Sequence, residues 1–414
     1  MDFTFTEEQR AATEAARAVF SGVAPDGVPS PALVPGAVAE DIDRPLWAGL
    51  AAGDLLGLTL APEHGGAGLD LVALCLVLRE SAKVLARVPL LETCAVAMAV
   101  QRYGDRELAA ALLPLVGRGS LVLTVGANGR TGHDPAELAV TARPDGDGST
   151  GGTGNSGSGS GSGSNNGNSG NSGSGAINGT ETSWVLDGVQ SAVPWAQAAD
   201  WIAVPAHTLD HRAVVALVRR DDAGVTIAEQ VSTSGELFGE MTLDAVRIEG
   251  RRLIDAAGAW EWLRSVLTTG TCARALGLGE AVLAMTSQYT GKREQFGFPV
   301  ATFQAVAVQT ADRYIDLRAM EVTLWQAAWR IGVGGSGPLP PAGDVAVAKI
   351  WASEGVRRVV QTAQHLHGGL GADTDYPLHR FHAWAKQIEL SLGPAAAHEE
   401  ALGDLLAARP LDFD

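Results

Sequence analysis

The hydrophobic pattern changes twice along the chain, and this order limits the folds that the chain can adopt. Up to about residue 118, apolar residues recur at helical spacing, as in the segments Leu46–Leu55, Leu71–Val88 and Glu107–Val116. From about residue 119 short β-type runs replace them, and helical spacing returns at about residue 252. We therefore expect an α+β protein with an N-terminal helical domain at 1–118, a central β domain at 119–251 and a C-terminal helical bundle at 252–414.

The β-type runs predict the form of the central domain. They are short, and Gly and Asp residues separate them, which is typical of a small antiparallel barrel or sandwich. The runs are 121–124, 139–141, 184–186, 201–204, 214–218 and 245–248. At the N-terminus, Thr6 is expected to cap a first helix, because Glu7, Glu8 and Gln9 follow it.

One segment of the central domain cannot form a packed element. Residues 148–175 are only Gly, Ser, Thr and Asn. Such a segment buries no apolar area to offset the entropy lost on ordering, so we expect a flexible insertion at a hairpin tip.

Composition excludes several classes of function. There are 30 Lys and Arg residues against 47 Asp and Glu residues, a formal net charge of -17, so the chain would repel nucleic acid. No uninterrupted apolar run is long enough for a membrane span. The cysteines Cys75, Cys94 and Cys272 are odd in number and far apart, which favours buried, reduced thiols and a cytoplasmic location.

The segment 288–304 is the most informative for function. A long helix ends in the basic pair Lys292-Arg293, an aromatic-glycine-proline turn follows, and Phe303-Gln304 opens the next helix. An arginine held at a helix end beside a turn suits bidentate contact with a phosphate group. The same pattern also fits an ordinary corner between two helices.

Three motifs resemble signatures of the acyl-CoA dehydrogenase family. An Arg-x-x-Phe-Gly-x-Pro motif followed by Phe-Gln is matched by Arg293, Phe296, Gly297, Pro299, Phe303 and Gln304. A Gly-Gly-x-Gly turn followed by Tyr-Pro and Arg is matched at 368–371, 376–377 and 380. An N-terminal Pro-Glu loop rich in glycine is matched at 62–68, with one residue fewer before the glycines. The resemblance spans nearly the whole chain except the insertion.

This resemblance implies a fold of N-terminal helices, a central β-barrel and a C-terminal four-helix bundle, with FAD bound between subunits. The contacts that it implies with the FAD of a neighbouring subunit fall on Arg293, Phe296, Gln304, His365, Leu366, His367, Gly368 and Gly369. Glycine lets the backbone approach a pyrophosphate, and a guanidinium matches its charge. The family usually has Gln where this chain has His365.

The resemblance also implies a catalytic glutamate that this chain lacks. The family's usual position is occupied by Leu392, and an alternative position on an earlier helix falls near Leu267, with Thr268 after it in place of an arginine. Leucine cannot accept the proton that the reaction removes. Glu389 is the nearest carboxylate in the sequence, and a capping or solvated role is an alternative for it.

We therefore expect a subunit resembling those of the actinobacterial heteromeric (α2β2) acyl-CoA dehydrogenases of steroid side-chain breakdown. It would contribute FAD-binding residues and have no catalytic residue of its own. Expected partners are an acyl-CoA substrate, a second acyl-CoA dehydrogenase-like subunit and an electron-transfer flavoprotein or similar acceptor. The alternatives are a homomeric dehydrogenase with a non-standard base such as Glu389 and a flavin-free pseudoenzyme.

Two other cofactor hypotheses are weaker. His365 and His367 have a spacing that can bind zinc, but no cysteine or dense carboxylate group accompanies them, so we expect no metal. Gly277 and Gly279 lack the third glycine of the dinucleotide-binding fingerprint, and they lie within a helical pattern instead of after a strand.

Overall fold

A computed structural model gives the structure of the protein. It describes residues 4–25, 31, 33–39, 42–128, 138–146, 183–334 and 339–409. The insertion predicted at 148–175 lies outside these residues. The N-terminal elements are α1 (Glu7–Phe20), α2 (Arg44–Ala52), the 3-10 turn η1 (Pro62–His64), α3 (Leu71–Ala82), α4 (Leu90–Tyr103) and α5 (Arg106–Gly117).

Local sequence explains how several of these elements begin and end. The predicted cap at Thr6 is confirmed: its Oγ1 accepts a hydrogen bond from the Gln9 amide at 3.2 Å, and the Gln9 side chain accepts one from the Thr6 amide at 3.0 Å. Helix α3 is shorter than the predicted Leu71–Val88, because the chain turns at Leu85, whose φ is 51°. The glycine-rich loop after η1 is tightly packed, since a Cβ on Gly66 would lie 2.1 Å from the carbonyl oxygen of Leu60.

The central region is one eight-stranded sheet. Its strands are β1 (Leu123–Val125), β2 (Val140–Pro144), β3 (Ser183–Pro194), β4 (Trp201–Thr208), β5 (Ala213–Arg219), β6 (Val225–Val231), β7 (Leu237–Glu249) and β8 (Leu253–Ile254). The order is β6-β7-β3-β2-β4-β5-β8, and β1 pairs with β4 in parallel. Within the described residues the end strands β6 and β8 do not pair with each other, so the sheet does not close as the predicted barrel would. The predicted fold class nevertheless matches.

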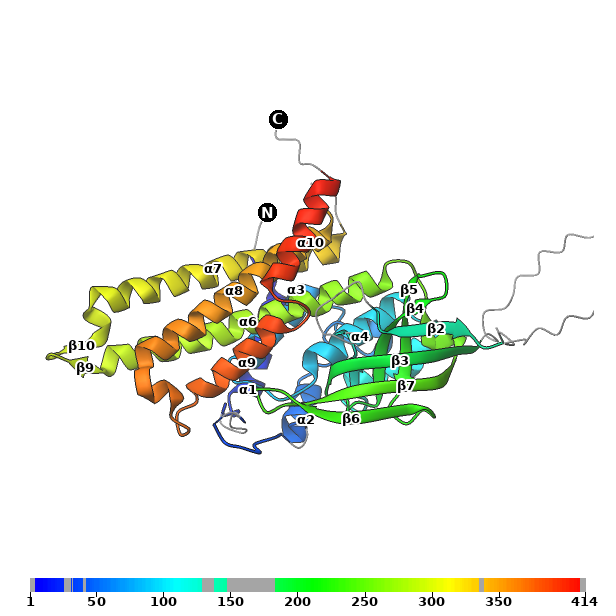
Figure 1. Cartoon of the computed structure of the whole chain (residues 1–414), viewed down its shortest axis with the longest axis horizontal. Helices are drawn as coiled ribbons and strands as arrows, with labels where there is room; N and C mark the ends of the chain where they lie inside the picture. Colours follow the sequence, from blue (N-terminus) through cyan, green and yellow to red (C-terminus); the bar gives the residue numbers. More distant parts are fainter. Residues whose placement is uncertain are drawn as a thin grey trace, which may run out of the picture.

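The C-terminal region is a helical bundle. It contains α6 (Ala259–Lys292), the β9–β10 hairpin (Glu294–Gln295 and Phe298–Pro299), α7 (Gln304–Val333), α8 (Pro341–His367), α9 (Leu378–Leu390) and α10 (Ala395–Ala408). Short 3-10 turns are η2 (Gly250–Arg252), η3 (Val300–Thr302) and η4 (Gly368–Ala372). Helices α6, α7 and α8 lie side by side and extend away from the sheet (Figure 1). The predicted domain boundaries fall between α5 and β1 and within η2, and they remain predictions.

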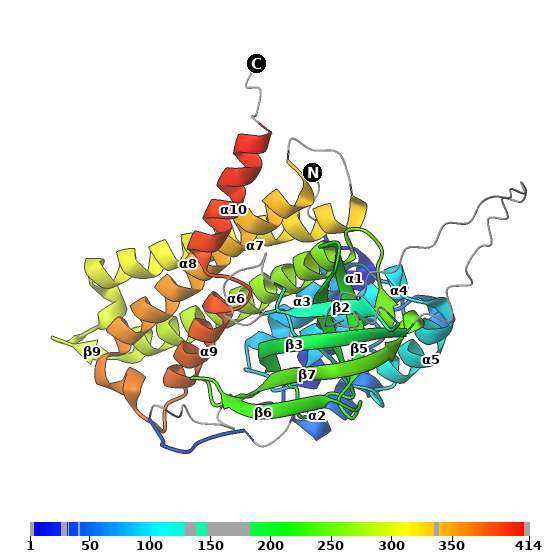
Figure 2. The same cartoon turned by 45° about the vertical axis from the view of Figure 1, so that its right-hand side comes forward.

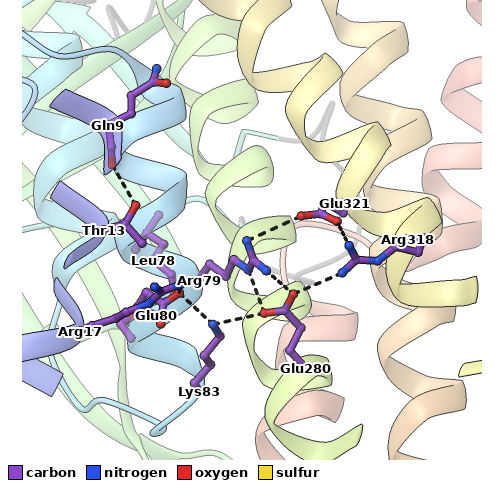
Figure 3. Close-up of polar contacts among 11 residues, drawn as sticks. Gln9, Thr13, Arg17, Leu78, Arg79, Glu80, Lys83, Glu280, Arg318 and Glu321 are labelled. Carbon is purple, nitrogen blue, oxygen red and sulfur yellow. Dashed lines mark hydrogen bonds and ion pairs between the residues drawn. The ribbon is translucent and has the colours of Figure 1, made fainter. Parts of the chain in front are cut away.

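The N-terminal helices contact both the sheet and the bundle. Helix α4 contacts β1, where Thr93 Oγ1 donates to the Leu123 carbonyl at 2.7 Å. Figure 2 shows α4 and α5 beside the sheet. Helices α3 and α6 pack so closely that a Cβ on Gly277 would lie 1.9 Å from the Arg79 carbonyl oxygen. Beside this contact, the Arg79 guanidinium binds the Glu280 carboxylate, with Nε 2.8 Å from Oε2 (Figure 3).

The ion pairs around Glu280 join α3, α6 and α7. Lys83 Nζ lies 3.3 Å from the Glu280 carboxylate, and the Arg318 guanidinium lies 3.7 Å from it. Arg79 also lies 3.7 Å from Glu321 on α7 (Figure 3). These charges are partly buried, so solvent screens them less than it screens charges on an open surface.

The three cysteines are free and buried, as predicted. Burial raises the pKa of Cys94 and of Cys272 to about 12, so both thiols are protonated and unreactive at neutral pH. Among the helices of the described residues, none is both long and apolar enough to cross a membrane.

Candidate functional site

A pocket lies where the three regions of the chain meet. Helix α4, strand β1, the turns beside β3 and β7, helix α6 and the end of α9 all contribute to it. Its cavity volume is about 60 Å³, and it is partly open to solvent. We call it the central pocket; it is lined by Leu91, Glu92, Val125, Ala127, Asn128, Pro194, Trp195, Glu236, Leu237, Phe238, Leu267, Thr271, Arg274, Trp384, Gln387, Ile388, Ser391 and Leu392.

Both positions at which a catalytic glutamate was expected face this pocket as leucines. Leu267 lies on α6 and Leu392 follows α9, yet both line the central pocket. Leu392 adopts a left-handed backbone conformation, with φ at 59°. Its carbonyl accepts a hydrogen bond from His398 Nε2 at 2.9 Å, which holds this turn. The two predicted positions are therefore close in space, and neither offers a proton acceptor.

The turn before Leu392 is also held by a buried lysine. Lys349 is fully buried, and its Nζ donates to the carbonyls of Ile388 at 3.0 Å and Glu389 at 2.9 Å. These carbonyls lie in the last turn of α9, where a cation is favourable. Burial lowers the pKa of Lys349 to about 8.

Glu389, the substitute base considered from the sequence, does not line the central pocket. Its Oε2 lies 2.6 Å from Lys386 Nζ, in an ion pair on the same helix. Its carboxylate is therefore engaged by a lysine and is not directed at the pocket.

Two carboxylates that the sequence did not single out do line the pocket. Glu92 comes from the first turn of α4, and Glu236 from the connection before β7. Each is buried, and each has one carboxylate oxygen, Oε2, without a hydrogen-bond partner. Burial raises the pKa of both groups, although neighbouring arginines oppose the shift.

Arginines accompany both carboxylates. Arg274 Nη1 lies 3.5 Å from Glu92 Oε1, and Arg87 Nε lies 2.9 Å from Glu236 Oε1. Neither glutamate belongs to one of the sequence motifs described above. Glu92 lies on α4 and Glu236 in the β6–β7 connection, both far in the sequence from the C-terminal signatures. Only the tertiary structure brings them to the pocket that Leu267 and Leu392 also line.

The predicted FAD contacts do not line the central pocket. They gather instead at the far end of the bundle, where α6 and α8 end and the β9–β10 hairpin projects (Figure 1). We call residues 289–304 together with 365–377 the hairpin end. The structure therefore brings Arg293, Gln304 and the 365–369 segment to one end of one bundle.

The first half of the hairpin end, residues 289–304, contains exposed side chains, and one of them is an arginine without a partner in the described part of the chain. Arg293 ends α6 and is exposed, and its guanidinium has no hydrogen-bond or ion-pair partner within the described residues. Its carbonyl accepts from the Val300 amide at 2.7 Å, which brings it beside the start of α7. Gln304 is the first residue of α7 and is exposed, and Phe296 at the hairpin tip is 90% exposed.

In the second half of the hairpin end, residues 365–377, it is mainly the backbone of two glycines that is exposed. His365, Gly368 and Gly369 are exposed, Leu366 is half-buried and His367 is buried. Gly368 has φ 60° and ψ -133°, a conformation that side-chain-bearing residues rarely adopt. Apart from the adjacent backbone, no heavy atom of the described residues lies within 4 Å of the position that a Cβ would take on Gly368 or Gly369.

These residues fit a phosphate-bearing cofactor. An unpaired arginine, the amino end of a long helix and an open glycine backbone are each favourable for an anion. Within the described residues no group of three or more His, Cys, Asp and Glu side chains could hold a metal ion.

Comparison with known proteins is consistent across the chain. Residues 6–120 match the model of the acyl-CoA dehydrogenase N-terminal domain, and residues 266–406 match that of the acyl-CoA dehydrogenase C-terminal domain. The acyl-CoA dehydrogenase FadE27 of Mycobacterium tuberculosis is 32% identical over 376 residues, which cover 90% of each chain.

Solved structures are similar over nearly the full length. A chain of a Tcur3481–Tcur3483 steroid ACAD variant is 36% identical with a TM-score of 0.81, and the match covers 97% of this chain and 98% of that one. A chain of the ChsE4–ChsE5 complex from Mycobacterium tuberculosis is 31% identical with a TM-score of 0.82, and the match covers 99% of this chain and 100% of that one.

Proposed function

The chain belongs to the acyl-CoA dehydrogenase family, and we propose that it is the subunit of a two-chain acyl-CoA dehydrogenase that contributes residues to the FAD of its partner. Family membership makes it an FAD-dependent oxidoreductase acting on acyl-CoA thioesters. The finer proposal is that this chain has no catalytic glutamate of its own. The observation that carries it is the pair Leu267 and Leu392, which fill both expected base positions of one pocket.

The hairpin end supports a contribution to a neighbouring subunit. Arg293, Gln304, His365 and the Gly368–Gly369 backbone are exposed, and none of them lines the chain's own central pocket. The chain's own central pocket therefore lacks these groups, and this hairpin end is free to serve another chain's FAD. Phe296 and Leu366 would complete the contact, as the family signatures imply.

An uncovered apolar face supports a partner subunit as its occupant. Large apolar side chains are exposed along α7: Val308, Tyr314, Ile315, Val322, Trp329 and Val333. A monomer rarely leaves such a row in water. The row is continuous with the hairpin end through α7, and the similar structures with more than 30% identity are named as two-chain assemblies. We therefore propose a second acyl-CoA dehydrogenase-like chain on this face.

When bound, FAD would supply the hydride acceptor of the reaction, and removal of the α-proton of the thioester would require a carboxylate. Arg293 would bind the pyrophosphate of the partner's FAD, with its guanidinium donating to phosphate oxygens. The Gly368–Gly369 backbone would lie against the ADP portion, because no side chain intervenes there. The proton acceptor would come from the partner.

The substrate class follows from the relatives by analogy. We propose an acyl-CoA of lipid or steroid side-chain catabolism, because a similar structure is named as a steroid ACAD. We further propose an electron-transfer flavoprotein or similar acceptor, and a cytoplasmic location.

The test is to purify the chain alone and with a candidate partner expressed beside it, and to record visible spectra and acyl-CoA oxidation. The proposal predicts flavin colour and activity only for the two-chain preparation. Full activity of the chain alone would contradict it. Absence of flavin from both preparations would favour the flavin-free pseudoenzyme.

A second candidate is a self-sufficient dehydrogenase whose base is Glu92. The observation favouring it is the unpartnered Oε2 of Glu92, which belongs to a residue lining the central pocket and having a raised pKa. A buried carboxylate with a raised pKa is a stronger base than a solvated one. This candidate requires that Glu92→Gln abolish activity of the chain alone while its FAD stays bound.

A further inference from the structure

His367 lies at the centre of a small buried cluster at the hairpin end. Only 3% of the residue is exposed, and both ring nitrogens are engaged. Nδ1 lies 2.8 Å from the Ala363 carbonyl oxygen, and Nε2 lies 3.0 Å from the Tyr376 hydroxyl. The imidazole also stacks on Tyr289, with ring centroids 4.5 Å apart and planes inclined by 16°. No polar atom of this ring is left to contact a cofactor.

The cluster joins three segments that are separate in the sequence. Tyr289 belongs to the last turns of α6, His367 is the last residue of α8, and Tyr376 lies between η4 and α9. Arg293 is one turn beyond Tyr289, and its amide donates to the Tyr289 carbonyl at 2.8 Å. Gly368 follows His367 directly. The cluster therefore lies between the two halves of the proposed FAD contact.

The hydrogen bonds fix the protonation state of the ring. A carbonyl oxygen only accepts, so Nδ1 must carry the proton that is shared with Ala363. Burial lowers the pKa of His367 and keeps the ring neutral near pH 7. Nε2 is then an acceptor, and the Tyr376 hydroxyl donates to it.

We propose that His367 is a positioning residue: together with Tyr289 and Tyr376 it sets where the Gly368–Gly369 backbone lies relative to Arg293, and it does not itself contact FAD. The role as a site for a partner's FAD rests on the function proposed above. The claim that the cluster positions the backbone does not rest on that function. The positioning claim and the proposed function can therefore fail separately.

The geometric claim is tested on the full chain without FAD, by hydrogen exchange read by mass spectrometry. Tyr376→Phe removes one hydroxyl, and His367→Phe keeps a stacking ring but removes both hydrogen bonds. We expect the amides of residues 293–304 and 368–377 to exchange about tenfold faster in both variants, because a buried partner loses its hydrogen bond. Tyr103→Phe, a hydroxyl deletion in the N-terminal region, is the matched control and should change neither segment.

The double variant His367→Phe/Tyr376→Phe should exchange no faster than the more affected single variant, since the two residues share one hydrogen bond. Unchanged exchange at 293–304 in Tyr376→Phe would overturn the proposal, because α6 would then be positioned without the cluster. Exchange raised equally over the whole chain would also overturn it, since that result indicates general destabilisation.

The link to FAD is tested in the complex with the partner subunit, by titrating FAD and following flavin fluorescence. Tyr376→Phe should raise the dissociation constant about threefold to tenfold, and this effect should shrink in the Arg293→Ala background. Equal effects in both backgrounds would overturn positioning through Arg293. If Arg293→Ala itself leaves FAD affinity unchanged, the function proposed above fails, while the exchange result still decides the geometric claim.

Discussion

Arg293→Ala is expected to weaken FAD binding without weakening the fold. The Arg293 side chain is exposed and makes no hydrogen bond or ion pair within the described part of the chain. Its backbone contacts, to Tyr289 and Val300, do not depend on the side chain. Removing the guanidinium should therefore leave the thermal midpoint of the chain nearly unchanged.

The loss of affinity follows from the contact that the guanidinium would make. A charge-assisted hydrogen bond to phosphate in a water-poor interface is worth roughly 1.5 to 3 kcal/mol. That range lowers FAD affinity by about tenfold to somewhat more than a hundredfold. The assay is fluorescence titration of FAD into the flavin-free complex of this chain with its partner subunit.

Lys292→Ala is the matched control, because it removes the same charge from the adjacent exposed residue. A lysine lacks the planar fork that binds two phosphate oxygens at once. We expect less than about a threefold change for this variant, since it removes only a screened charge. Equal losses in both variants would refute the specific contact, and unchanged affinity in Arg293→Ala would refute the contact altogether.

Further predictions concern stability and the vacated base. Gly277→Ala should destabilise the chain by at least about 1 kcal/mol, because the new Cβ meets the Arg79 backbone, whereas Gly291→Ala on the same helix has open space and should be neutral or stabilising in urea unfolding. The pKa of His398, lowered by burial to about 4, implies that stability falls between about pH 6.5 and pH 4 by roughly 2 to 3 kcal/mol, and that His398→Gln loses this dependence. Leu392→Ala should leave acyl-CoA oxidation by the assembled complex within about twofold, since it removes no proton acceptor; a collapse with flavin retained would contradict this.

Sequence periodicity predicted the order of the three regions but missed particular elements. Helix α4 was missed because nearly all of its residues from Leu90 to Val100 are buried, so it has no polar face to reveal its period. Strand β6 was missed because it is an exposed strand at the end of the sheet, with polar residues such as Glu229 and Gln230. Closure of the sheet depends on pairing between distant strands, which local sequence does not specify.

For the candidate site, too, one part could be predicted from the sequence and another part could not. Motifs with fixed spacing predicted an FAD contact at the hairpin end, because Arg293, Gln304 and Gly368 lie in continuous segments, and this contact remains a prediction. The carboxylates of the central pocket could not be found from the sequence, because Glu92 and Glu236 reach it only through packing of α4 and the β6–β7 connection. The sequence also did not distinguish the exposed His365 from the buried His367, since that difference depends on Tyr289 and Tyr376.

The central claim is that the proton acceptor of the reaction is not on this chain. The most direct measurement is the rate of flavin bleaching by acyl-CoA, without oxygen, in the two-chain complex that carries Glu92→Gln and Glu236→Gln in this subunit. These substitutions remove both carboxylates that line the central pocket. The account predicts a bleaching rate within about twofold of the unmodified complex, because the partner supplies the base. A fall of about a hundredfold or more, with FAD still bound and the subunits still assembled, would contradict it.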